Sequence, residues 1–138
     1  MSKRTKINLI AVALLAMSYP AVVLGYTWTH VLMSEFEGGR HGPLDAYRHT
    51  LASAFVSYTT TPSVVALVSF VMENNTKRSS AMDRHNNNIG AGIGQSAIKL
   101  REIEPLVARS ITNGAVNSQQ IQQSTWLPKE DWRPGKLW

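Results

Sequence analysis

The chain contains no cysteine among its 138 residues. Disulfide-stapled scaffolds and sites in which thiolates bind zinc or iron–sulfur clusters are therefore excluded. The absence is compatible with an oxidising compartment but does not establish one.

Charge is also sparse, at 17% Asp, Glu, Lys and Arg, with a net charge of +5. Part of the positive charge comes from Lys3, Arg4 and Lys6, and the rest forms no concentrated basic helix and no interleaving with aromatic residues. We therefore expect no binding to nucleic acid. The chain has no internal repeat, and its length favours one domain.

A hydrophobic segment occupies the N-terminus. The basic residues precede an apolar run from Ile7 to about Trp28, and roughly 20 such residues suffice to span a bilayer. We interpret residues 1–28 as an uncleaved signal anchor that contacts the membrane through residues 7–28, or as a signal peptide. A buried core helix is a third interpretation.

The basic flank of this segment predicts a cytoplasmic N-terminus and an exported body. The expected location is the inner membrane, in a single pass with the body in the periplasm. If residues 1–28 are cleaved, the protein would instead be secreted to the periplasm.

The remainder is expected to be all-α. Residues 29–41 are expected to form a linker or a short helix. Pro43 with Asp45 two residues later is then typical of a helix start, and apolar residues follow at helical spacing. Pro62 opens a segment at 63–73 that is apolar almost all round and too short to span a membrane. This segment predicts a buried helix, with a strand as the alternative.

Two more helices are expected. Ser80 and Asp83 fit a Ser-x-x-acid capping signal at the start of one of them. Gly90 and Gly94 in that helix indicate close approach of another helix or a ligand, because glycine costs helix stability. Pro105 begins a further amphipathic segment.

The expected architecture is an N-terminal membrane or signal helix followed by a compact bundle of about four helices at residues 42–116. Residues 117–138 are glutamine-rich at first and tryptophan-rich later. We expect them to form an extended tail packed on the core, with a disordered end as the alternative.

Two polar clusters carry the candidate chemistry. In Gly-Pro-Leu-Asp-Ala-Tyr-Arg-His-Thr, the spacing places Asp45, Arg48 and His49 on one face of a helix. A second cluster runs from Asp83 to Asn88, and we expect it to face the first. Each acid also has a structural alternative, since carboxylates near a helix N-terminus compensate its dipole.

Three interpretations remain open if the clusters meet. Asp45, His49 and Asp83 could bind a divalent metal ion such as zinc or manganese, although no cofactor is assigned. His49 could act as a general base held by Asp45 or Asp83, with Arg48 and Asn86 stabilising an anionic transition state. The groups could also form a purely structural polar core.

Residues Gly42 to Ala54, together with Met82-Asp83-Arg84-His85-Asn86-Asn87-Asn88-Ile89-Gly90, resemble DUF6973, a domain family of unknown function. That family has an Asp-Ala-Phe/Tyr-Arg-His-Ala helix, a His-Glu pair ending the next helix, and then Met-Asp-x-x-Asn-Asn-x-x-Gly. The resemblance covers about residues 42–115, half the chain. Family members are often C-terminal modules of secreted or toxin-like bacterial proteins, which implies a small helical module that is hydrolytic or otherwise toxic.

The resemblance also implies a set of functional residues. The shared polar positions are Asp45, Arg48, His49, Glu73, Asp83, Asn86, Asn87 and Gly90. This chain has Met72 where the family has histidine, so one imidazole of the pattern is missing. We expect catalytic roles for His49, Asp45, Arg48, Asp83 and Asn86, and substrate-binding roles for Glu73, His85, Asn87 and Gly90.

Two functional hypotheses follow. The first is an envelope-facing, hydrolase-like protein that acts on a cell-envelope component, either a phospholipid or a peptidoglycan precursor. A looser likeness of Asp83-Arg84-His85-Asn86 to the Asp-Arg-His-Asp helix of bacterial phospholipases A2 keeps membrane lipid among the substrates. The second is a non-enzymatic, membrane-anchored binding protein, such as an exclusion, inhibitor or immunity factor, with a membrane protein as partner.

The two hypotheses predict different surroundings for His49. A hydrolase needs His49 in an open cleft beside Asp83. A binding protein predicts that these groups are sealed and that an exposed apolar or tryptophan-rich patch lies elsewhere.

Overall fold

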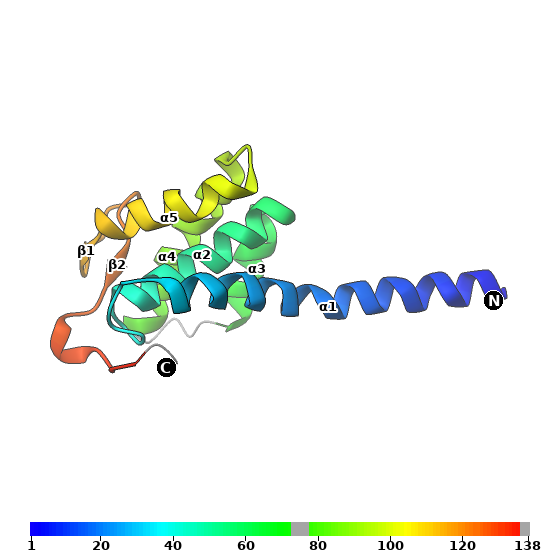
Figure 1. Cartoon of the computed structure of the whole chain (residues 1–138), viewed down its shortest axis with the longest axis horizontal. Helices are drawn as coiled ribbons and strands as arrows, with labels where there is room; N and C mark the ends of the chain where they lie inside the picture. The colour runs from blue at the N-terminus through cyan, green and yellow to red at the C-terminus, as the bar shows by residue number, and fades with distance from the viewer. Residues whose placement is uncertain (73–77, 136–138) are drawn as a thin grey trace.

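The computed structural model describes residues 1–72 and 78–135, apart from the side chains of residues 70–72. Within these residues the protein is all-α with an N-terminal apolar helix, as predicted, and has one small parallel sheet. The elements are α1 (Lys3–Met33), α2 (Pro43–Thr59), α3 (Pro62–Met72), α4 (Arg78–Ser96), α5 (Ile103–Thr112), β1 (Ala115–Val116) and β2 (Thr125–Trp126), with 3-10 turns at Leu100–Glu102 and Lys129–Asp131 (Figure 1).

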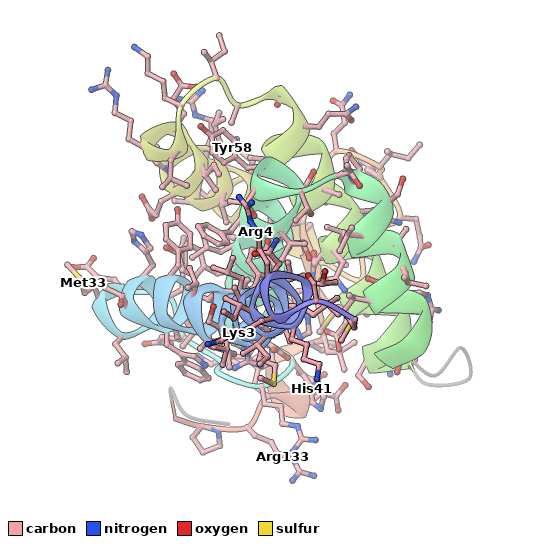
Figure 2. The ribbon with its side chains drawn as sticks, turned by 90° about the vertical axis from the view of Figure 1, so that its right-hand side faces the viewer. Lys3, Arg4, Met33, His41, Tyr58 and Arg133 are labelled. Carbon is pink, nitrogen blue, oxygen red and sulfur yellow. The ribbon has the colours of Figure 1, made fainter. Side chains whose placement is uncertain are left out.

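The two halves of α1 have different surroundings. The N-terminal half is exposed and projects away from the body (Figure 1), and Figure 2 looks along it from the end that carries Lys3 and Arg4. The C-terminal half runs antiparallel to α2, where Tyr26 stacks on Phe55 with ring centroids 4.4 Å apart and Val31 is fully buried. By length and composition α1 can cross a membrane, and none of its most apolar stretch is buried in the body.

Two expected boundaries were wrong. Because α1 continues to Met33, residues 29–33 are helical and do not belong to a linker. Because α4 begins at Arg78, Ser80 and Asp83 lie inside the helix and do not cap it. The segment after Pro62 is a helix, so the strand alternative is also excluded.

Helices α2 and α4 make the most extensive helix–helix contact, and they run parallel. A Cβ atom at Gly90 would lie 2.2 Å from the carbonyl oxygen of Thr50, and one at Gly94 would lie 2.2 Å from that of Ala54. Only glycine allows this approach, since real Cβ contacts are much longer. The crossing sets the register that carries Asp83, two helical turns before Gly90, to α2.

The apolar core lies mainly between α2, α5 and the end of α1. Its fully buried members are Val31, Leu44, Ala46, Tyr47, Leu51, Ala54, Ile103, Val107 and Ile111. The Tyr47 hydroxyl donates a hydrogen bond of 2.9 Å to Glu104 Oε1, so α5 is tied to α2 by a polar contact as well. Burial, followed by this hydrogen bond, raises the pKa of Tyr47.

The described part of the tail contacts the loop before α2. The backbone N–H of Leu127 donates to the carbonyl oxygen of His41 at 2.9 Å. The backbone N–H of Arg133 donates to the carbonyl oxygen of Arg40 at 3.1 Å. The Trp132 indole donates to the Leu127 carbonyl oxygen at 2.7 Å. Residues 117–124 contain turns and no helix.

Candidate functional site

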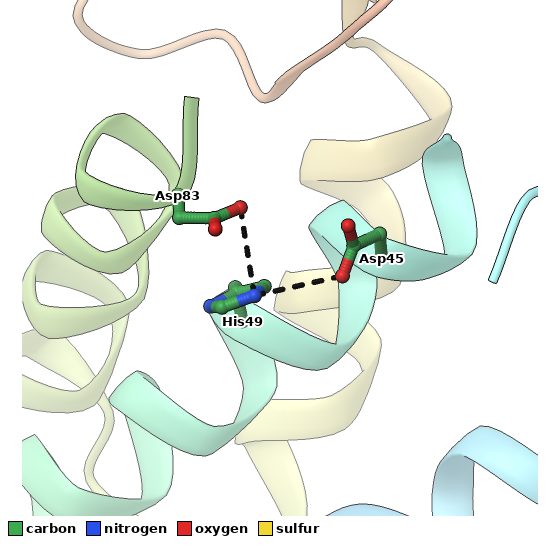
Figure 3. A group of neighbouring side chains, drawn as sticks. All are labelled: Asp45, His49 and Asp83. Carbon is green, nitrogen blue, oxygen red and sulfur yellow. Dashed lines mark ion pairs between the residues drawn. The ribbon is translucent and has the colours of Figure 1, made fainter. Parts of the chain in front are cut away.

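Asp45, His49 and Asp83 meet at the interface of α2 and α4. Figure 3 shows the His49 ring between the two carboxylates, one from its own helix and one from α4. Its Nε2 atom lies 3.5 Å from Asp45 Oδ1 and 3.5 Å from Asp83 Oδ1. The two expected polar clusters therefore face each other, and among the described residues these three side chains converge.

Asp45 is held tightly in place and its side chain is only 4% exposed. Its Oδ1 accepts a hydrogen bond from Arg48 Nη2, and its Oδ2 accepts one of 2.6 Å from the backbone N–H of His41. Arg48 also donates to the Gly39 carbonyl oxygen at 3.1 Å and lies over the Trp28 ring at 5.7 Å. The carboxylate thus has a fixed orientation at the first turn of α2.

A polar cavity of about 380 Å³ opens beside these groups. It is lined by Arg40, His41, Asp45, Arg48, His49, Ser79 and Asp83. His49 therefore stands in an open cleft beside Asp83, which is the arrangement that the hydrolase hypothesis requires. Arg40 and Arg48 give the cavity cationic side chains that can contact an anionic group.

Arg40, His41 and Ser79 were not among the expected site residues. A sequence signal did exist for His41, since it directly precedes the Gly-Pro helix start. In the structure its φ is +67°, which is unusual for a residue other than glycine. Burial lowers the pKa of His41, Asp45 opposes that shift and Arg40 adds to it. His41 is therefore neutral at pH 7 and adds no charge of its own to the cavity.

An apolar cavity of about 290 Å³ lies on the other side of His49. It is lined by Val23, His49, Ala52, Ser53, Val56, Val65, Val68, Ser69 and Asn87, from α1, α2, α3 and α4. Leu67, which lies on α3, is 63% exposed. Among the residues that the structure describes, His49 is the one that lines both this cavity and the polar one.

Asn86 and Asn87 have hydrogen-bond partners other than the three converging side chains, and Asn87 lines the apolar cavity together with His49. Asn86 is fully buried, and its amide donates to the Thr125 carbonyl oxygen at 2.8 Å and accepts from the Thr125 N–H at 2.9 Å. Asn87 accepts from Ser53 Oγ at 2.9 Å and donates to Ser69 Oγ at 2.9 Å. Both amides join α4 to neighbouring segments.

The other expected substrate-binding residues have separate surroundings. His85 Nε2 is 2.8 Å from the Gln123 carbonyl oxygen and lines a cavity of about 200 Å³ against the tail. Gly90 lies at the crossing of α2 and α4. Glu73 lies outside the described residues.

Known proteins offer no guide to this site. No protein-family model matches the chain, and no curated protein or solved structure is significantly similar to it. The likeness to DUF6973 therefore stays a prediction, and function has to be argued from the chemistry of the cavities.

Proposed function

We propose that this chain is a membrane-anchored hydrolase that faces the cell envelope and cleaves an amphiphilic envelope lipid. One observation carries the proposal: His49 lines both an apolar cavity and a polar cavity that contains two arginines and two aspartates. Such a pair of cavities suits a molecule with an anionic headgroup and a hydrocarbon tail, with the bond between them beside the imidazole.

The headgroup would occupy the polar cavity. Arg40 and Arg48 provide guanidinium groups, which match the geometry and charge of phosphate. The hydrocarbon chain would occupy the apolar cavity, whose 290 Å³ is room for about ten groups of the size of a water molecule. A phospholipid placed this way has its carboxylic ester next to His49.

Hydrolysis at this point needs a group that accepts a proton. The oxygen of water attacks the acyl carbon, the bond from that carbon to the glycerol oxygen breaks, and the proton of water ends on the glycerol oxygen. His49 with Asp45 and Asp83 provides the basic group at the wall between the two cavities. In a lipid-linked peptidoglycan precursor, a phosphoester would occupy the same position.

The arrangement of α1 supports access from the membrane. Val23 lies in the apolar run of α1 and also lines the apolar cavity. If α1 spans the bilayer, the cavity opens where the helix leaves it, so a lipid reaches the site without crossing water. The basic residues at the N-terminus favour a periplasmic body.

The test is lipid turnover by the full chain in phospholipid nanodiscs. Fluorescent phosphatidylglycerol and a lipid-linked peptidoglycan precursor would be supplied separately, and products would be identified by mass spectrometry. We expect product from one of them, and a loss of at least 100-fold in His49→Ala, since general acid–base groups contribute about 10²–10⁴-fold.

His30→Ala is the matched control, because His30 is an imidazole on α1 outside both cavities. It should retain wild-type turnover. Absence of product from the wild type with both lipids, or equal turnover by His49→Ala, would contradict the proposal.

A non-enzymatic binding protein is the second candidate. It is favoured by the pairing of Asp45 with Arg48 and His41, which suits a polar group that only fixes helix packing. It predicts that His49→Ala and Asp45→Asn lower the melting temperature together, and that wild-type protein yields no product from either lipid.

A further inference from the structure

We propose that His49 Nε2, Asp45 Oδ1 and Asp83 Oδ1 bind one divalent transition-metal ion, zinc or manganese, at the wall of the polar cavity. The inference uses the site of the proposed hydrolase and adds a ligand to it, and it does not depend on which lipid is cleaved. It rests on the spacing, the chemistry and the fixed orientation of the three side chains.

The spacing of the three ligand atoms suits a common ion better than hydrogen bonds. Both nitrogen-to-oxygen distances are 3.5 Å, which is longer than the 2.7–3.2 Å of N–H···O hydrogen bonds. Ligand atoms about 2.1 Å from a tetrahedral ion lie about 3.4 Å from one another. One ligand atom from each residue lies within 4.8 Å of the other two, so a single ion can contact all three after small side-chain movements.

The orientation of the two carboxylates around His49 also supports a metal ion. Here both carboxylates face Nε2 of His49, as Figure 3 shows. Convergence of two anionic oxygens on one nitrogen is what a shared cation requires.

The chemistry of the three ligands narrows the choice of ion. Two carboxylate oxygens and one imidazole nitrogen are donors that zinc and manganese accept. Calcium and magnesium prefer oxygen donors alone, and the sequence contains no cysteine for softer metals.

Asp45 is oriented by neighbours in the way that metal ligands are. Arg48 and the His41 N–H fix its carboxylate, and such outer contacts tune metal ligands in known sites. Arg48 donates its hydrogen bond to one lone pair of Asp45 Oδ1. A carboxylate oxygen has two lone pairs, so the second lone pair of Oδ1 can bind a metal ion.

Three protein ligands leave a coordination position for water. This number is typical of catalytic zinc sites, whereas structural sites have four protein ligands. The polar cavity of about 380 Å³ offers the space, and Arg40 lines the same cavity. A metal bound here would lower the pKa of its water and thereby supply hydroxide near neutral pH.

The experiment measures metal binding directly. The full chain in detergent micelles is stripped with a chelator and titrated with zinc chloride by calorimetry, and manganese chloride is followed by electron paramagnetic resonance. We expect one ion per chain, and affinity at least tenfold weaker in Asp83→Asn and in His49→Gln. Asp83→Asn keeps the shape of the side chain, His49→Gln replaces the ring by a polar amide, and circular dichroism checks the fold of both variants.

Asp131→Asn is the matched control, because Asp131 is an exposed acid outside the cavity that pairs only loosely with Arg78, at 3.9 Å. It should bind as the wild type does. The inference is overturned if folded wild-type protein binds neither ion, or if Asp83→Asn binds as tightly as Asp131→Asn.

Binding and turnover can fail separately. Zinc binding that depends on Asp83 supports the metal site even when no lipid is cleaved, and that result would overturn only the proposed function. Lipid cleavage by folded wild-type protein that binds neither ion would overturn the inference and leave the hydrolase.

Discussion

Three glycines of α4 give a sharp test of how this fold is held together. Gly90 and Gly94 lie against the backbone of α2, whereas a Cβ atom at Gly92 would have no atom within 4 Å. We therefore compare Gly90→Ala, Gly94→Ala and Gly92→Ala, which are the same chemical change within two turns of one helix.

The expected change in the free energy of unfolding has one sign for Gly90→Ala and Gly94→Ala and the opposite sign for Gly92→Ala. Alanine is favoured over glycine inside a helix by about 1 kcal/mol at each of the three positions. At Gly90 and Gly94 the new methyl group would lie 2.2 Å from a carbonyl oxygen, so the helices must separate, and we assign this overpacking about 3 kcal/mol. The net expectation is a loss of about 2 kcal/mol for Gly90→Ala or Gly94→Ala and a gain of about 1 kcal/mol for Gly92→Ala.

Thermal unfolding of the full chain in detergent, followed by circular dichroism, measures the difference. At roughly 4 °C per kcal/mol, Gly90→Ala and Gly94→Ala should melt about 8 °C below the wild type, and Gly92→Ala about 4 °C above it. Equal melting temperatures for the three variants, or a stabilised Gly90→Ala, would refute the close crossing of α2 and α4. The position of Asp83 opposite His49 would then lose its support.

Three further outcomes are expected. Asn86→Ala leaves the buried N–H and carbonyl of Thr125 without their partners and should lower the free energy of unfolding by about 3 kcal/mol in chemical denaturation. Tyr47→Phe removes the hydrogen bond to Glu104 and should cost about 1–2 kcal/mol by the same measurement. Backbone hydrogen bonds from Lys99 and Ile98 lower the pKa of Glu102, so its stabilising effect is present above pH 4.5 and is lost as the pH falls through the lowered pKa. The melting temperatures of wild type and Glu102→Gln should differ at pH 7 and converge as the pH falls below the lowered pKa of Glu102.

Each outcome has a result that would contradict it. An Asn86→Ala variant that unfolds with the same free energy as the wild type would refute the stabilising role of the paired amide. An unchanged unfolding curve for Tyr47→Phe would show that the contact with Glu104 contributes nothing. A gap between wild type and Glu102→Gln that stays constant from pH 7 down through the acid range would assign the effect of Glu102 to something other than its charge.

Helix positions followed largely from the sequence because they depend on local rules. Pro43 and Pro62 fix the starts of α2 and α3 through their restricted φ and missing N–H. The start of α4 was misplaced because the capping pattern at Ser80 also occurs inside helices, where a serine can be buried by packing. The end of α1 was misplaced because its last turns are stabilised by contact with α2, which no local signal reports.

The candidate site was only partly predictable. Asp45, Arg48 and His49 share one helical face by spacing alone, and that part was visible. Asn86 was also expected in the site. Asp83 and Asn86 are three residues apart on α4 and still face different neighbours, and the Asn86 amide forms hydrogen bonds with Thr125 instead. Arg40 and His41 reach the cavity because a loop is held by the tail, a contact between segments about 90 residues apart.

The sequence by itself determined the helical class, the apolar N-terminal helix and the polar face of α2, since all three are properties of neighbouring residues. Tertiary structure decided which side chains meet: the parallel register of α2 and α4, set where Gly90 and Gly94 touch the backbone of α2, carries Asp83 to His49. It also decided that His49 lies between a polar and an apolar cavity, because a cavity is the space left by several packed elements and belongs to none of them alone.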